Sequence, residues 1–206
     1  MTILRTALVA ATLCACVARA ASLEVRVRDA AGAPVPDAAV YAVPASGPSD
    51  ARNPRVVAIE QVEREFVPYM TVVQVGTQVK FPNRDEVRHH VYSFSPAKRF
   101  EIKLYAGTPA DPIAFDKPGE VVLGCNIHDH MIAYIYVVDS PWFAKTDRDG
   151  NARIDGLPGG EYDVNGWYYA QDKSPAAVPV GLRSDEAGSA ALSIGRRTMM
   201  PRPVAK

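Results

Sequence analysis

The residues best suited to chemistry lie in the short segment from Cys125 to Met131, which reads Cys-Asn-Ile-His-Asp-His-Met. Within it Cys125, His128 and Met131 place a thiolate, an imidazole and a thioether three residues apart. A second source of imidazole lies upstream, at His89 and His90. Two imidazoles and one thiolate in a trigonal plane with a weak axial thioether select copper and support electron transfer. The spacing therefore predicts a site for one copper ion.

Each of these side chains also has an ordinary structural explanation. A free cysteine is usually an inert buried thiol, and a methionine usually fills gaps in a core. The spacing of the three donors outweighs these explanations. Cys125 and His128 could instead be a nucleophile and its base, but no orienting acid or oxyanion-binding device accompanies them. The chain is therefore not expected to be an enzyme, and its four histidines are too few for a larger copper oxidase.

The upstream imidazole is ambiguous because His89 and His90 are neighbours in a segment that favours a strand. Successive side chains on a strand point to opposite faces, so only one of the two can face the site. His130 is a further alternative as an extra ligand, although five donors would disturb the trigonal geometry.

The first twenty residues have the features of an export signal. An apolar run over 6–17 follows a basic residue, and an Ala-Arg-Ala cleavage site ends at Ala20. We therefore expect a signal peptide over 1–20 and export to a periplasm-like compartment. Cys14 and Cys16 faintly resemble a lipid-attachment box, which leaves lipidation as an alternative. The apolar run is too short to span a bilayer, so no transmembrane segment is expected.

Charge and cysteine content limit the kinds of partner that we expect the chain to bind. The chain has 23 basic and 23 acidic residues, and cleavage removes Arg5 and Arg19 to leave 21 basic residues against 23 acidic ones. Without a basic excess, nucleic acid and anionic membranes are not expected partners. Cleavage also leaves Cys125 as the single cysteine, which in an exported chain pairs with another chain, stays reactive or ligates a metal. The nearby imidazoles favour the metal.

Short strands with frequent Gly, Pro, Asn and Asp punctuation dominate the rest of the chain, which predicts an all-β fold. A break rich in Pro, Ser and Gly over 44–54 and a proline at 141 separate a central block from two flanks. The basic, proline-containing tail over 196–206 is expected to have little order. The predicted strands cover 23–28, 38–43, 56–62, 71–75, 78–81, 89–95, 100–104, 111–115, 120–125, 132–138, 151–154, 161–168, 176–182 and 190–194.

Residues 55–140 resemble a cupredoxin of the amicyanin and plastocyanin kind. Two intervals, from Asn83 to His89 and from His128 to Met131, are similar to those of amicyanin. The segments Cys-Asn-Ile-His-Asp and His-His-Val-Tyr-Ser-Phe-Ser also look like a periplasmic group named methylamine utilization proteins. The motifs that carry the cupredoxin resemblance are, in chain order, Val75-Gly76-Thr77, Phe81-Pro82-Asn83, His89-His90-Val91, Lys117-Pro118-Gly119, Cys125, His128 and Met131.

This resemblance implies a Greek-key cupredoxin β-sandwich that holds one copper ion, as Cu(I) or Cu(II). It implies that His89, Cys125 and His128 are the strong ligands and Met131 the long axial ligand, with His128 as the electron port. His90 takes the place of a family Asn and is expected to tie the two ligand loops together by a hydrogen bond. Departures from the family around the port imply a more polar docking surface and a different partner.

The flanks, 22–50 and 142–195, resemble the two halves of a smaller β-sandwich of the transthyretin-like or carboxypeptidase-regulatory-like kind. The resemblance rests on the segments Gly-Ala-Pro-Val-Pro-Asp-Ala at 32–38 and Gly-Leu-Pro-Gly-Gly-Glu-Tyr at 156–162. It implies a split module that frames the central domain as an insertion and binds partners or stiffens the architecture. Three consecutive aromatic residues at 167–169 are typical of core or rim positions.

Two functions follow from these expectations. The first is a periplasmic type 1 (blue) copper protein, a monomer that carries one electron to or from an unidentified redox partner protein. The alternative is a copper-binding or delivery module without redox traffic, in which Met131 does not bind and the metal exchanges readily.

Overall fold

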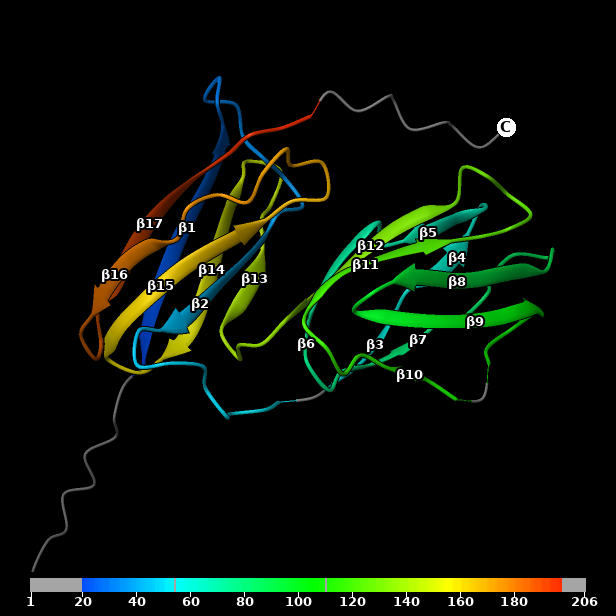
Figure 1. Cartoon of the computed structure of the whole chain (residues 1–206), viewed down its shortest axis with the longest axis horizontal. Helices are drawn as coiled ribbons and strands as arrows, with labels where there is room; N and C mark the ends of the chain where they lie inside the picture. Colours follow the sequence, from blue (N-terminus) through cyan, green and yellow to red (C-terminus); the bar gives the residue numbers. More distant parts are fainter. Residues whose placement is uncertain (1–19, 54, 110, 198–206) are drawn as a thin grey trace, which may run out of the picture.

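The computed structural model describes residues 20–53, 55–109 and 111–197. All the regular elements assigned in these residues are β-strands, so the prediction of an all-β fold is confirmed. The strands form two assemblies that lie end to end, one from the flanks of the sequence and one from its centre (Figure 1). The described residues contain no helix with the length and apolar character needed to cross a membrane. The predicted signal peptide falls on 1–20, of which only Ala20 lies within the described residues.

The flank assembly has two sheets around a shared core, in the orders β14-β1-β17 and β13-β2-β15-β16. Successive side chains of β1 point to opposite faces of its sheet. Leu23 and Val25 are buried, whereas Glu24 and Arg26 are exposed. These apolar side chains pack against others from the opposite sheet, such as Val164. The strands are β1 (Ala21–Asp29), β2 (Ala39–Pro44), β13 (Phe143–Lys145), β14 (Asn151–Leu157), β15 (Gly160–Trp167), β16 (Val178–Leu182) and β17 (Ala187–Ile194).

Parallel pairing of β1 with β17 brings the two ends of the described chain together, from Ser22 beside Ala187 to Asp29 beside Ile194. The sequence between β2 and β13 therefore leaves the flank assembly and returns to it. That excursion builds the whole central assembly.

The central assembly consists of a five-stranded sheet, β6-β12-β11-β8-β9, a three-stranded sheet, β10-β7-β3, and the hairpin β4-β5. Its core joins side chains of both sheets, among them Val79, Val91, Val121 and Ile135. The same cluster includes Cys125. The strands are β3 (Val56–Ala58), β4 (Glu60–Val62), β5 (Glu65–Val67), β6 (Met70–Gln74), β7 (Gln78–Lys80), β8 (His89–Ser95), β9 (Lys98–Tyr105), β10 (Ile113–Ala114), β11 (Gly119–Gly124) and β12 (Ile132–Val138).

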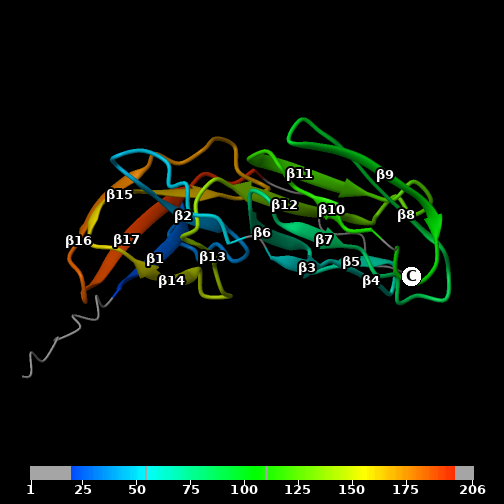
Figure 2. The same cartoon turned by 90° about the horizontal axis from the view of Figure 1, so that it is seen from below.

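A third cluster of buried side chains, the junction cluster, joins the two assemblies where β12 meets the flank sheet (Figure 2). Its buried members are Met70 and Tyr134 from the centre and Ala39 and Trp167 from the flanks. The Trp167 ring stacks on Tyr136 with a centroid distance of 4.5 Å and an interplanar angle of 11°. Trp167, at the end of β15, therefore packs between the two assemblies.

Apart from shifts of up to three residues at strand ends, the strand predictions differ from the structure in four places. The segment 56–62 forms two strands, β3 and β4, because Ile59 between them is fully buried and its N–H donates to the Lys80 carbonyl. The short strands β5 and β13 were not predicted. The predicted strand over 111–115 is reduced to the two residues of β10.

The first two residues of the predicted tail contact the flank assembly. Arg196 forms a bridge with Gln171 and lies 3.5 Å from the carboxylate of Asp29. The backbone N–H of Arg197 donates to the Ala170 carbonyl, and its side chain donates to the Gln171 carbonyl. The expectation for the tail stays a prediction, and 198–206 lie outside the described part.

Candidate metal centre

The loop 125–131 closes the hairpin between β11 and β12, since Gly124 pairs with Ile132. Within the loop the Met131 N–H donates to the His128 carbonyl at 2.9 Å, which makes a tight turn. Cys125 and Met131 are buried in the central core, and His128 is half-buried. The hairpin thus fixes the three predicted donors of this loop at one end of the sheet.

Strand β8 brings the upstream imidazole to the same place. β8 pairs with β11 at Tyr92 and Gly124, and His89 stands at the first position of β8. One donor atom from each of His89, Cys125 and His128 lies within 4.8 Å of the others. The Cys125 Sγ is 3.9 Å from the His128 Nδ1, and the two imidazole centroids are 5.0 Å apart. The fold therefore brings together the donor atoms of residues that lie more than thirty positions apart in the sequence.

The two ring nitrogens of His89 have opposite environments. The Nε2 atom lies 2.7 Å from the Asp85 carboxylate, which accepts its hydrogen bond. The Nδ1 atom is buried and has no hydrogen-bond partner. A buried polar atom without a partner costs about 1–3 kcal/mol, so natural proteins rarely leave one unmatched. A bound metal ion would supply the missing partner, and the sulfur and two nitrogens fit copper.

The surroundings of the site favour the neutral form of His128 and the charged form of Asp85. Burial lowers the pKa of His128, and nearby His89, Arg64 and His130 lower it further against an opposing effect of Asp85. A depressed pKa keeps the imidazole neutral at pH 7, which is the form that binds metals. Burial alone would raise the pKa of Asp85, but the Arg64 N–H, the His89 ring and the Glu63 N–H hold it below its usual value.

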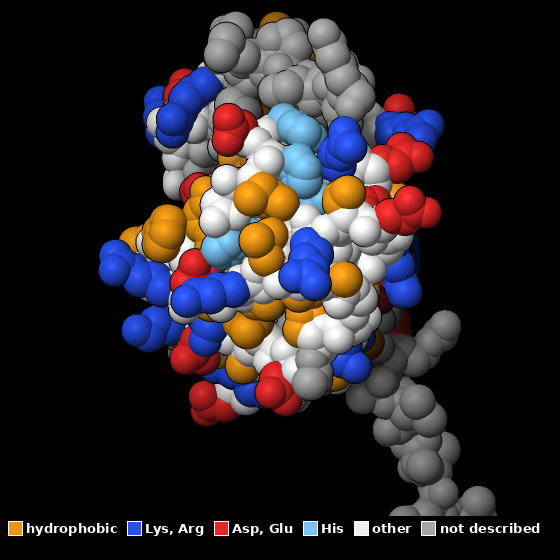
Figure 3. Space-filling view, turned by 90° about the vertical axis from the view of Figure 1, so that its right-hand side faces the viewer, with side chains coloured by type: hydrophobic (Ala, Val, Ile, Leu, Met, Phe, Trp, Pro, Cys, Tyr) orange, Lys and Arg blue, Asp and Glu red, His pale blue; other side chains and the backbone are white. Residues whose placement is uncertain are grey.

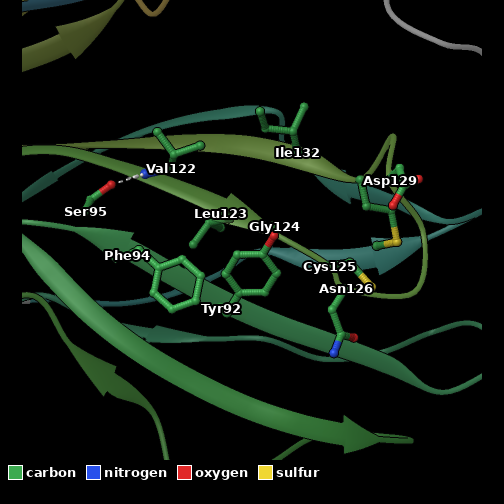
Figure 4. A pocket seen from close by; sticks show the side chains of 11 residues that line it. Tyr92, Phe94, Ser95, Val122, Leu123, Gly124, Cys125, Asn126, Asp129 and Ile132 are labelled. Carbon is green, nitrogen blue, oxygen red and sulfur yellow. Dashed lines mark hydrogen bonds between the residues drawn. The ribbon is translucent and has the colours of Figure 1, made fainter.

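Met131 is buried at the end of the loop that carries Cys125 and His128. It is 2% exposed and follows His128 in the same turn. Met131 and Cys125 line a pocket of about 680 Å³ on the outer side of the five-stranded sheet. Figure 4 shows Tyr92 and Phe94 beside each other in this pocket, with the Tyr92 ring next to Gly124. Both sulfur-containing side chains are almost fully buried although they line this pocket.

The other two histidines lie outside the donor group. His90 points to the opposite face of β8, where its Nε2 lies 3.0 Å from the Glu101 carboxylate without the alignment of a hydrogen bond. The expectation that His90 ties the ligand loops together is therefore wrong, because alternation on the strand turns it away. The His130 ring is 6.1 Å from the His128 ring, and its buried Nε2 has no hydrogen-bond partner.

Asp85 is the residue that sequence reasoning missed. It lies four positions before His89, and the sequence analysis assigned it no role. The available signal was a carboxylate close in sequence to a candidate imidazole ligand, since such ligands usually donate their second N–H to a carboxylate or carbonyl. Asn83 supports this loop, because its Oδ1 accepts the Asp85 N–H and its Nδ2 donates to the Val87 carbonyl.

The surface around the site combines imidazole with apolar side chains. Figure 3 views the molecule from this end and shows histidine side chains at the surface with apolar side chains beside them. Ile127 is 46% exposed and Phe94 is 73% exposed. Such an exposed apolar edge is compatible with contact to another molecule.

Gly124 is constrained by the aromatic ring across the strand pair. A Cβ atom at this position would lie 2.7 Å from Cζ and 2.8 Å from Oη of Tyr92. We expect Gly124→Ala to lower the free energy of unfolding by about 1–2 kcal/mol because the ring must move. In a Tyr92→Ala background the same change should cost less than about 0.5 kcal/mol. Equal costs in both backgrounds, measured by denaturant titration, would show that the ring is not the obstacle.

Comparison with known proteins gives fold neighbours alone. No protein-family model and no curated protein matches the chain. A copper-containing nitrite reductase from Thermus scotoductus SA-01 is 28% identical with a TM-score of 0.39, over 46% of this chain and 25% of its own. A reduced Cu(I) amicyanin mutant is 18% identical with a TM-score of 0.37, over 48% of this chain and 99% of its own. Pseudoazurin from Methylobacterium extorquens AM1 is 23% identical with a TM-score of 0.35, over 41% of this chain and 76% of its own.

Each of these three matches covers less than half of the chain. The chain spans a quarter of the nitrite reductase that it matches. These matches do not confirm the resemblance to the methylamine utilization group.

Proposed function

We propose that the chain is an exported type 1 copper protein that carries one electron between partner proteins. His89, Cys125 and His128 would hold one copper ion, and Met131 would be a weaker fourth donor. The observation that carries the proposal is the grouping of a thiol and two imidazoles within 4.8 Å, with a buried His89 Nδ1 that has no other partner. A thiolate with two imidazoles is the donor set of blue-copper centres.

The side chains of the site have distinct tasks in this function. Copper held by this donor set would alternate between Cu(I) and Cu(II) and so accept and release one electron. Cys125, 4% exposed, keeps its sulfur away from oxidants at the end of β11. The paired strands β8, β11 and β12 hold the donors in place, so little rearrangement opposes electron transfer. His128 is half-buried at the surface and offers the contact point for a partner.

A copper-delivery function is the second candidate. The observation in its favour is the pocket that reaches both Cys125 and Met131, because an opening beside two sulfur ligands would ease metal exchange. A carrier keeps its metal for many redox cycles, whereas a delivery protein transfers it to an acceptor. The rate at which a chelator removes Cu(I) from the protein separates the two functions.

The architecture fits an exported carrier with one accessory module. The proposed units are a signal peptide over 1–20, a cupredoxin domain over 55–140, a split β-sandwich over 22–50 and 142–195, and a tail over 196–206. The two hydrophobic clusters, one in each assembly, support the division into two modules. We propose a periplasmic location, a redox protein as partner, a monomer and no enzymatic activity.

The visible spectrum of the Cu(II)-loaded protein tests this function. We expect an intense charge-transfer band from the thiolate to copper, which disappears in Cys125→Ser because an alkoxide-type oxygen cannot replace the sulfur. Ser93→Ala, a buried change on β8 away from the donor set, is the control and should keep the colour. A colourless wild-type complex would favour delivery, and a wild-type protein that binds no copper would exclude both functions.

A further inference from the structure

Asp85 connects the candidate metal centre to a turn that is distant in sequence. One carboxylate oxygen accepts the N–H of Glu63 at 2.7 Å, and the other accepts the N–H of Arg64 at 2.9 Å. The second oxygen also accepts from His89 Nε2 at 2.7 Å. The Asp85 side chain is only 14% exposed. A single carboxylate therefore binds the β4–β5 turn and the candidate ligand at once.

The backbone of the β4–β5 turn needs the support of the Asp85 carboxylate. Glu63 and Arg64 have φ angles of 53° and 60°, in the left-handed region that glycine normally occupies. Each such residue costs about 1–2 kcal/mol, so the conformation needs support from its surroundings. Asp85 provides it by accepting both N–H groups, which are themselves fixed by the hairpin β4-β5. The loop before β8 closes from the other side through the bond from the Asp85 N–H to Asn83.

A carboxylate in this place has two consequences for His89. As an acceptor it fixes the proton on Nε2, so that the lone pair is on the free Nδ1 atom that faces the donor group. As an anion it forms a stronger bond than a neutral carbonyl would and makes the imidazole a better donor. Its charge also favours the more positive of two metal states by Coulomb attraction.

We propose that Asp85 is a positioning residue of the metal centre that fixes the tautomer of His89 and lowers the reduction potential of the bound copper. The inference rests on the proposed function, because it concerns the same site. Asp85 does not contact the metal in this assignment. It acts through His89, with its own position set by the β4–β5 turn.

The test compares Asp85→Asn with Glu86→Gln in the copper-loaded protein. Both changes remove one negative charge. Glu86 is exposed, and the described contacts include no hydrogen bond between it and His89. For Asp85→Asn we expect the affinity for Cu(II) to fall about tenfold relative to that for Cu(I). This ratio corresponds to a rise of about 59 mV in the reduction potential of a one-electron couple. For Glu86→Gln we expect a change of about twofold or less, since solvent screens an exposed charge.

A second measurement uses the metal-free protein and is independent of copper chemistry. Nitrogen NMR of the imidazoles should show one tautomer of His89, protonated at Nε2, in the wild type, and a mixture in Asp85→Asn. If Asp85→Asn does not fold, the Glu63→Gly variant relieves the turn. The pair Glu63→Gly and Glu63→Gly/Asp85→Asn then gives the same comparison.

The outcomes separate this inference from the proposed function. A wild-type complex without the thiolate band overturns the proposed function and this inference with it. A blue wild-type complex, with the same potential in Asp85→Asn and Glu86→Gln, overturns only the role of Asp85. An unchanged His89 tautomer in folded Asp85→Asn has the same consequence.

Discussion

Replacement of Trp167 by Ala is expected to lower the free energy of unfolding by about 3–5 kcal/mol. The indole is 6% exposed and belongs to the junction cluster with Met70 and Tyr134. It stacks on Tyr136 at 4.5 Å and lies 6.4 Å from the Tyr134 ring. Truncation removes these contacts and leaves a cavity between two assemblies that cannot collapse without moving a whole sheet. Denaturant titration followed by circular dichroism measures the loss.

Trp142→Ala is the matched control for this prediction. Trp142 belongs to the same flank assembly and is half-buried, with its Nε1 donating to the Gly156 carbonyl and its ring edge on Tyr162. It packs against the flank core and has no place in the junction cluster. We expect its truncation to cost about half as much, because less area is buried. A loss for Trp167→Ala no larger than that for Trp142→Ala would mean that the junction cluster does not stabilise the molecule.

The sequence predicted most strands because burial on one face leaves a local pattern. His89–Ser95 and Ile132–Val138 were predicted with the bounds that the structure has. β5 escaped prediction because its hairpin turn is Glu63-Arg64, which carries none of the Gly, Asn or Asp residues that mark such turns. That turn depends on Asp85, twenty-one positions after Arg64. No local pattern can report such a dependence.

The same limit applies to the site and to the junction. The spacing of Cys125, His128 and Met131 is local, so the sequence alone could indicate the donor loop. Strand alternation alone could not decide between His89 and His90, and the resemblance to cupredoxins implied His89. The structure places His89 in the donor group. The role of Trp167 depends on β12 from the other assembly, and a run of aromatic residues cannot distinguish a rim from a junction.

Saturation with Cu(I) is expected to raise the free energy of unfolding by about 4 kcal/mol when the free metal is a thousand times its dissociation constant. The folded chain offers three donor atoms within 4.8 Å, whereas the unfolded chain separates His89 from Cys125 by more than thirty residues. Binding to the native state alone therefore shifts the equilibrium by mass action. Any weak binding of Cys125 in the unfolded chain reduces the gain.

Anaerobic denaturant titration with and without Cu(I) measures this stabilisation, and buffered Cu(I) keeps the free concentration known. His89→Ala is the informative variant, because it removes the donor that folding brings to the loop and leaves Cys125, His128 and Met131 in place. We expect it to retain only a small part of the gain. If His89→Ala were stabilised by Cu(I) as much as the wild type, the metal would bind to the loop alone, and β8 would contribute no ligand.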